Sequence, residues 1–250
     1  MTSLRLVVEA PAEVPLDEAL VVVVRLRNDG PAPVVTSSRL NLVEGDLSVW
    51  VRAEGGQQVR ADWPWPVDSG RRETTLAPGR ELVGSALLLA AVSTLFPGPG
   101  DYSIAAAFAP RPDTEVSSAP VVVGRPAPHD DAGRARQSAL EDPEVAQSIC
   151  SMSLMGSAAD GLALLGGSGE SPVAQLLSTC VTTVTAELPP AVERAVDATD
   201  AGTVAAALAS VLPPGLFPGD ERLAAAADVV GDAGDPAVAA LLSGTPAKAG

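Results

Sequence analysis

Apolar and polar residues alternate in short runs along the first half of the chain. In the first run, Leu4, Leu6 and Val8 alternate with Arg5 and Glu9. A period of two puts the apolar side chains on one face of a β-strand and the polar ones on the other. Further runs of this kind lie at 21–27, 47–52, 83–89, 102–108 and 116–123. The pattern therefore predicts a series of strands, each with one buried face.

Turn sequences separate these runs, as in Asn28-Asp29-Gly30-Pro31, Glu54-Gly55-Gly56 and Pro78-Gly79. The intervals between the runs are too short to hold helices, which excludes a parallel sheet built from β-α-β units. Two packed antiparallel sheets remain. We expect residues 1–124 to fold as an antiparallel β-sandwich.

Three segments of this half resemble bacterial immunoglobulin-like and fibronectin type III-like domains, over about residues 3–124. They are the turn Leu76–Leu82, the strand entry Pro99-Gly100-Asp101-Tyr102-Ser103-Ile104 and the closing run Val116–Val123. The resemblance implies an Ig-like sandwich. The family contains binding, spacing and inhibitory modules, including intracellular bacterial proteinase inhibitors, so it does not select a function. Antibody domains join their sheets by a cysteine pair, whereas this half has no cysteine.

Helix signals replace the alternation in the second half. Asp142-Pro143, Ser171-Pro172 and Asp235-Pro236 each place a capping side chain directly before a proline, which is typical of helix starts. Residues 125–133 lack periodicity and are expected to be a linker. Residues 134–250 are then predicted to form a small all-α bundle or an array of helical hairpins. The complete chain is thus predicted to be a two-domain β + α protein.

The best-marked helix follows Ser171, where apolar residues recur every three or four positions. Its apolar face consists of Val173, Leu176, Leu177, Cys180, Val181 and Val184. Further helices are predicted at 134–141, 158–165, 190–198, 201–212 and 221–231. The segment 222–236 resembles the helix-turn-helix unit of short HEAT-like repeats. Since the other segments match that unit poorly, both a repeat array and an ordinary bundle stay open.

The charge balance limits the choice of partners. Thirty-one acidic residues face sixteen basic ones, a formal net charge of −15. Because nucleic acids and anionic membranes require a basic face, we expect neither as a partner. No apolar run approaches the ~18 residues of a membrane span, and no leader peptide is visible. A cytoplasmic location is the resulting expectation.

Residues that carry chemistry are few. His129 is the single histidine and lies beside Asp130 and Asp131 in the predicted linker, without a second imidazole or a thiolate at ligand spacing. Cys150 and Cys180 lie in the helical half and are expected to be reduced and buried. No phosphate-binding loop or nucleophile motif is present. The sequence therefore predicts no enzyme, no metal and no cofactor.

One aromatic motif stands apart, Trp63-Pro64-Trp65-Pro66. Prolines lack a backbone N–H and confine the segment to a loop or a sheet edge. Two indoles there form either a partner-binding hot spot or a cover for the open end of the sandwich. Trp63 and Trp65 are our candidate binding residues.

The function predicted from these observations is non-catalytic protein–protein interaction, as an accessory or structural subunit of a larger cytoplasmic assembly. Two alternatives stay open. One is an intracellular proteinase inhibitor built on the sandwich. The other is a hydrolase that uses converging carboxylates, for which the chain has acids in excess.

Overall fold

A computed structural model describes residues 4–89, 94–167, 171–183, 187–231 and 235–248. In chain order, its strands are β1 Leu4–Glu9, β2 Leu20–Asn28, β3 Val34–Ser37, β4 Leu47–Ala53, β5 Gln58–Ala61, β6 Glu73–Leu76, β7 Arg80–Leu88, β8 Gly100–Arg111, β9 Thr114–Ser117, β10 Val121–Arg125 and β11 Ala247–Lys248. Its helices are α1 Asp131–Glu141, α2 Pro143–Ser151, α3 Ala159–Gly166, α4 Pro172–Thr182, α5 Leu188–Ala198, α6 Ala201–Val211, α7 Glu221–Val230 and α8 Pro236–Ser243. The chain combines antiparallel sheets with helices, in agreement with the predicted β + α composition.

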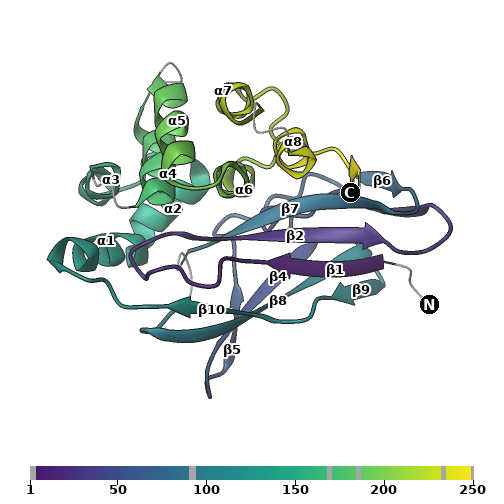
Figure 1. Ribbon diagram of the computed structural model, residues 1–250, viewed down its shortest axis with the longest axis horizontal. Helices are drawn as coiled ribbons and strands as arrows, with labels where there is room; N and C mark the ends of the chain where they lie inside the picture. The colour runs from purple at the N-terminus through teal and green to yellow at the C-terminus, as the bar shows by residue number, and fades with distance from the viewer. Residues whose placement is uncertain (1–3, 90–93, 168–170, 184–186, 232–234, 249–250) are drawn as a thin grey trace.

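Two main antiparallel sheets build the first half (Figure 1). One has the strand order β1-β2-β7-β11, and the other has the order β10-β8-β4-β5, with β9 also paired to β8. Strands β3 and β6 form a separate short pair. The alternating runs predicted as strands are all present. The sequence pattern missed β3, β5, β6 and β11, because two to four residues are too few to show a period.

The closing run predicted at 116–123 is two strands, β9 and β10, along the same partner β8. Pro120 cannot donate to the ladder. Just before it, Ser118 still donates its N–H to the Ala106 carbonyl at 2.8 Å and accepts the Ala106 N–H on its side-chain hydroxyl at 2.9 Å. The interruption divides the run without ending the sheet.

Side-chain capping is present at two of the three helix starts that the sequence marked. The Asp142 carboxylate accepts the Glu144 N–H at 2.8 Å, and the Asp235 carboxylate accepts the Ala237 N–H at 2.7 Å, which confirms two of the predicted starts. Ser171 is at the predicted position but does not cap α4. Its hydroxyl donates to the Asp17 carbonyl of the β half at 3.2 Å, because this serine is buried against that half.

The connection between the halves is shorter than the predicted linker 125–133. Strand β10 includes Arg125, and α1 begins at Asp131 because Asp130 caps it by accepting the Gly133 N–H at 2.7 Å. The segment before β2 also pairs with the end of β10, through the Val14 N–H and the Gly124 carbonyl at 2.9 Å. Only residues 126–130 lie between strand and helix.

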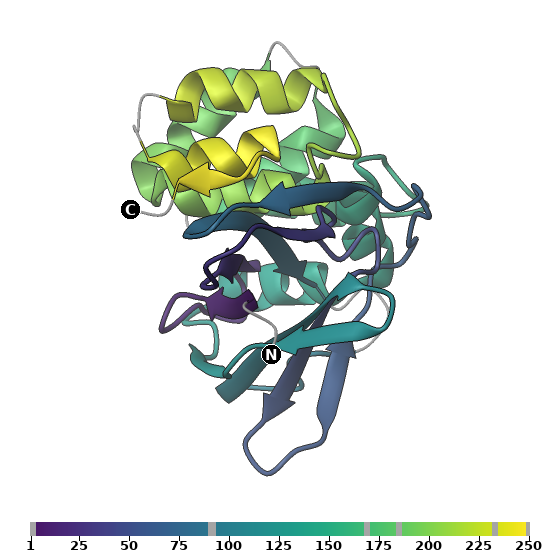
Figure 2. The same cartoon turned by 90° about the vertical axis from the view of Figure 1, so that its right-hand side faces the viewer.

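Helices cover the outer face of the β1-β2-β7-β11 sheet, and Figures 1 and 2 show them gathered on that side. Helix α6 is buried along most of its length and packs on β7 and β2. Its small side chains allow close approach, so that the Ser85 hydroxyl of β7 donates to the Ala206 carbonyl at 2.8 Å. After α8 the chain returns to this sheet as β11, whose Ala247 pairs with Glu81. The C-terminal half, predicted to be all helix, therefore also contains a strand.

The predicted apolar face after Ser171 is present on α4. Val173, Leu176, Leu177 and Cys180 are buried, whereas Val184 lies outside the described residues. Helices α7 and α8 contact each other. Since the turn at 232–234 is also outside the described residues, the HEAT-like resemblance stays a prediction.

Candidate functional site

The two predicted binding residues have different surroundings. Both lie in the loop between β5 and β6, but the Trp63 side chain belongs to the core with 9% of its surface exposed, whereas Trp65 is 39% exposed. Val67, two residues further on, is also 39% exposed. The loop therefore presents one indole and one aliphatic side chain to solvent, and holds the other indole inside.

Paired charges hold this loop in place. Arg72 at its end donates through Nη2 to both carboxylate oxygens of Glu44, at 2.7 and 2.6 Å. The Glu44 side chain is fully buried and also accepts from Asn41 at 2.8 Å and from the Ser69 hydroxyl. Hydrogen bonds to a buried carboxylate are strong, since the alternative is an unpaired charge. The segment that follows Trp65 is thus held by hydrogen bonds from both Ser69 and Arg72 to Glu44.

A second charged pair supports the same loop. The Arg39 guanidinium binds the Asp46 carboxylate, with Nε to Oδ2 at 2.8 Å, and donates through Nη1 to the Gly70 carbonyl at 3.1 Å. Partial burial by itself would raise the pKa of Asp46, but the hydrogen bonds from Arg39 and Ser37 outweigh it and hold that pKa below its ordinary value. This pair therefore stays ionised at neutral pH.

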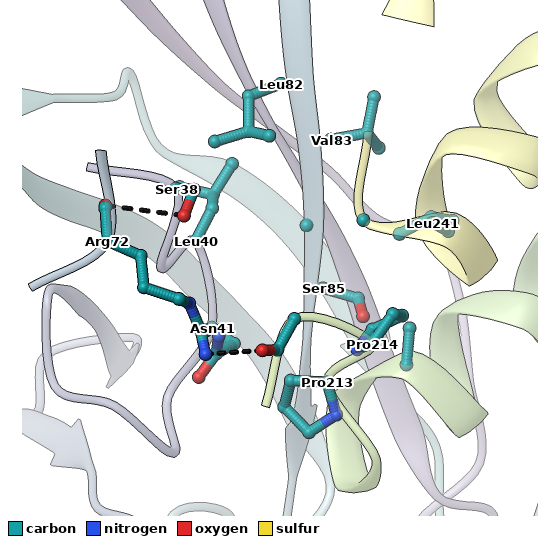
Figure 3. Close-up of a pocket in the computed structure, with 14 residues that line it drawn as sticks. Ser38, Leu40, Asn41, Arg72, Leu82, Val83, Ser85, Pro213, Pro214 and Leu241 are labelled. Carbon is teal, nitrogen blue, oxygen red and sulfur yellow. Dashed lines mark hydrogen bonds between the residues drawn. The ribbon is translucent and has the colours of Figure 1, made fainter. Parts of the chain in front are cut away.

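Figure 3 shows a small cavity where Arg72 reaches the helical half. Arg72 donates to the Gly215 carbonyl in the turn after α6, beside Pro213 and Pro214. Ser38 donates to the Arg72 carbonyl at 3.3 Å on the opposite wall. The cavity is about 50 Å³, which suits a few water molecules and is far below the ~300 Å³ of small-molecule sites. The cavity lies at a contact between the two halves of the chain.

Two adjacent acids, Asp17 and Glu18, lie at a second contact between the halves, which the sequence pattern did not single out. Asp17 forms a 2.6 Å ion pair with Arg136 of α1. Glu18 Oε1 accepts from Ala174 N in the first turn of α4 at 3.2 Å and from Ala19 N at 3.1 Å. Burial raises the pKa of Glu18 to about 7. Acids before a strand are common, so only the burial seen in the fold distinguishes this pair.

Arg125 completes this contact between the halves. Its guanidinium lies over the Phe96 ring, with Cζ 4.7 Å from the ring centroid, and Nη2 donates to the Glu18 carbonyl at 3.1 Å. Burial lowers the pKa of Arg125 to about 10, so it remains protonated at neutral pH. Both acids therefore contact the helical half, Asp17 through its ion pair with Arg136 and Glu18 through the Ala174 N–H.

A wider hollow opens between the helices and the β1-β2 side of the sheet. It has a volume of about 390 Å³ and is lined by side chains from β1, β2, α6 and α8. The lining is Glu9, Ala10, Pro11, Val21, Val23, Arg25, Asp200, Gly202, Thr203, Ala206, Asp235, Ala237, Val238 and Leu241. No sequence motif marked it, because its walls come from four separate elements.

The remaining candidate side chains lie apart from these features. His129 is exposed on the connection before α1. Cys150 and Cys180 are free and buried as predicted, and burial raises the pKa of each thiol to about 12, which makes both unreactive at neutral pH. Among the described residues, no group of three acids, histidines or cysteines is placed to hold a metal ion. No described helix is long and apolar enough to cross a bilayer.

Comparison with known proteins gives only remote likenesses. No family model and no curated protein matches the chain. A CARDB domain from Pyrococcus furiosus is similar over 50% of this chain and 94% of its own, at 15% identity and a TM-score of 0.27. A β-glucosidase from Erythrobacter marinus is similar over 49% of this chain and 15% of its own, at 20% identity and a TM-score of 0.27.

A β-glucosidase from Listeria innocua is similar over 50% of this chain and 16% of its own, at 15% identity and a TM-score of 0.28. The chain thus spans about a sixth of either glucosidase. TM-scores this low carry no argument about fold or function, so the function of this protein must be inferred from the contacts within its own chain.

Proposed function

We propose that strands β1 to β10 form an immunoglobulin-like domain. The strand orders β1-β2-β7 and β10-β8-β4 match the division of such domains into two sheets. Tyr102, near the start of β8, donates its hydroxyl to the Gly98 carbonyl just upstream, which corresponds to the tyrosine corner of these domains. Glu13 also forms a parallel bridge with Gly124 of β10, so the first segment of the chain reaches both sheets.

The function that we propose is non-catalytic protein binding, as an accessory subunit of a larger assembly. The observation that supports it is the exposure of Trp65 and Val67 on a loop fixed by the Arg72–Glu44 and Arg39–Asp46 pairs. A fixed loop loses little conformational entropy on binding, and tryptophan is enriched at interface hot spots. The net charge of −15 favours a protein partner over a nucleic acid.

The two tryptophans provide a matched test. Trp65→Ala removes an exposed ring and is expected to weaken capture of the native partner at least about tenfold, with little change in melting temperature. Trp63→Ala empties a buried site and is expected to lower the melting temperature by roughly 10 °C. The experiment is quantitative co-purification of each variant from the native cell, with calorimetry alongside. Equal capture by Trp65→Ala and the wild type would contradict the proposal.

The same loop supports a second candidate, a proteinase inhibitor. Inhibition requires a stiff exposed loop that resists cleavage. Pro64 and Pro66 restrain this one, together with the two ion pairs. Incubation with a panel of proteases separates the candidates. Stoichiometric inhibition that Trp65→Ala abolishes would favour the inhibitor, and rapid cleavage within residues 62–70 would exclude it.

A further inference from the structure

The hollow between the helices and the sheet has apolar side chains on two opposite walls. Val21 and Val23 of β2 form one wall, and Ala206 of α6 and Leu241 of α8 form the other. Val21, Ala206 and Leu241 are buried, whereas Val23 is half-buried. A half-buried valine at the base of a groove of about 390 Å³ leaves apolar surface that one or two aliphatic side chains of a ligand could cover.

The rim of this groove is acidic. Glu9, Asp200 and Asp235 line it, and all three are exposed. Arg25 is the single basic residue in the lining, and it is already paired with Glu9 at 2.9 Å and with Glu81 at 2.8 Å. The charge at the opening is therefore negative.

Two of these acids are held in place by helix capping. Asp200 accepts the Thr203 N–H at 2.8 Å at the start of α6, and Asp235 caps α8. The positive end of each helix offsets part of one carboxylate charge. Glu81, the second partner of Arg25, adds a further carboxylate beside the groove. The net charge at the opening of the groove therefore remains negative.

A second hollow of about 210 Å³ lies between α7 and α8. It shares Asp235 and Val238 with the groove, and its lining includes Val230 and Leu242. The first turn of α8 thus has apolar hollows on two sides, with a carboxylate between them. This arrangement suits an extended surface better than a single small molecule, because small-molecule sites surround their ligand and direct buried polar groups at it.

We propose that the groove between β1-β2 and α6-α8 docks a basic, amphipathic segment of a partner protein, with an apolar side chain on Val23 and lysines or arginines against Glu9, Asp200 and Asp235. The inference rests on the proposed protein-binding function and adds a second contact surface to it. Charge complementarity selects this occupant. A second copy of the chain has the same net charge of −15 and only sixteen basic residues, so it fits this rim poorly.

The test uses a short fluorescein-labelled peptide of leucine and lysine in a helical amphipathic pattern, with a leucine–glutamate peptide of the same pattern as the charge control. Fluorescence anisotropy with the full chain is expected to detect binding of the lysine peptide only. Val23→Phe fills the groove and is expected to weaken that binding at least about tenfold. Val122→Phe, on an exposed position of β10 that is outside the groove lining, is expected to leave it unchanged.

A second pair of variants keeps the test decisive if Val23→Phe folds poorly. Ala10→Lys places a positive charge in the lining, whereas Ala12→Lys makes the same change in net charge on an exposed residue outside it. We expect weaker binding for Ala10→Lys alone. Equal effects of the two lysines, equal binding of both peptides, or self-association of the wild type that Val23→Phe abolishes would overturn the proposal.

Failure of the groove and failure of the proposed function give different results. Trp65 is not part of the groove lining, so Trp65→Ala is expected to bind the lysine peptide normally. If the peptide does not bind but partner capture still depends on Trp65, the groove is not a docking site and the proposed protein-binding function stands. If the peptide binds in a Val23-dependent way but Trp65→Ala has no effect on partner capture, the groove proposal stands and the proposed function of the Trp65 loop is contradicted.

Discussion

Glu18 shows how strongly the surroundings of one residue change its chemistry. Its carboxyl group lies at the first turn of α4, with Ser171 beside it and Asp17 as a charged neighbour. Arg125 and Arg136 also reach this contact between the halves, through the Glu18 carbonyl and the Asp17 carboxylate. Loss of hydration is the largest influence and outweighs the hydrogen bonds that favour the ionised form, so the pKa rises from its ordinary 4.5 to about 7.

The raised pKa predicts that stability falls as the pH increases. Between pH values of about 4.5 and 7 the unfolded chain ionises at Glu18 while the folded chain stays protonated. The folded state then binds more protons, so its free energy of unfolding decreases with rising pH, by roughly 3 kcal/mol across that window if this group acts alone. Urea unfolding at about pH 5 and about pH 8 measures the change.

Glu18→Gln is the control, because its side-chain oxygen can still accept from Ala19 and Ala174 but does not titrate. The variant is expected to lose most of the pH dependence between these two values. An unchanged slope would show that another group dominates in this range.

At the level of elements, β7 links the two halves. One face of the strand contributes to the sandwich core through residues such as Leu82 and Ala86, and the other carries Ser85 against α6. Gly84 lies between Leu82 and Ala86 in the sequence of β7. A Cβ atom added at Gly84 would be 1.9 Å from the Leu40 carbonyl oxygen. The loop around Leu40 therefore contacts β7 at a distance that only glycine permits.

Gly84→Ala is expected to destabilise the protein by about 1–3 kcal/mol, since backbone or strand must shift to remove the overlap. Gly231→Ala is the matched control. It adds the same methyl group at a helix end with ordinary φ, and nothing lies within 4 Å of it. Denaturant midpoints of the two variants give the comparison, and similar losses for both would contradict the close approach at β7.

At the level of the whole molecule, the two halves share an extensive contact. Arg136 pairs with Asp17, Arg72 with the Gly215 carbonyl, and Arg80 donates to the Pro246 carbonyl at 3.1 Å. Buried apolar residues of both halves form one continuous cluster. Each half therefore covers a surface of the other that would be apolar if exposed.

We predict that cutting the connection leaves the halves associated. A specific protease site inserted after Ala127, which is exposed, is expected to be cleaved, and the two pieces are expected to elute together in size-exclusion chromatography. Denaturant should separate them. Elution of a folded β fragment on its own under native conditions would show that the sandwich is independent, as the predicted boundary at 125–133 implies.

Short-range sequence patterns were enough to predict most of the local elements. Alternation of apolar residues predicted the long strands because a strand exposes every second side chain. Asp142 and Asp235 marked helix starts because a carboxylate satisfies free N–H groups there. These are short-range effects, so they are readable from a few adjacent residues. Strands β3, β5, β6 and β11 were missed because they are too short to show a period. The contact of Ser171 with the Asp17 carbonyl was missed because the two residues lie far apart in the sequence.

Which side chains meet depends on how the elements pack in three dimensions. Trp63 and Trp65 are alike in sequence, yet one is buried and the other exposed. Glu18 resembles the other acids of the chain until α4 removes its water. The groove is formed by β1, β2, α6 and α8, whose residues lie at opposite ends of the chain. Burial and charge environment depend on such long-range packing, which no local pattern in the sequence encodes.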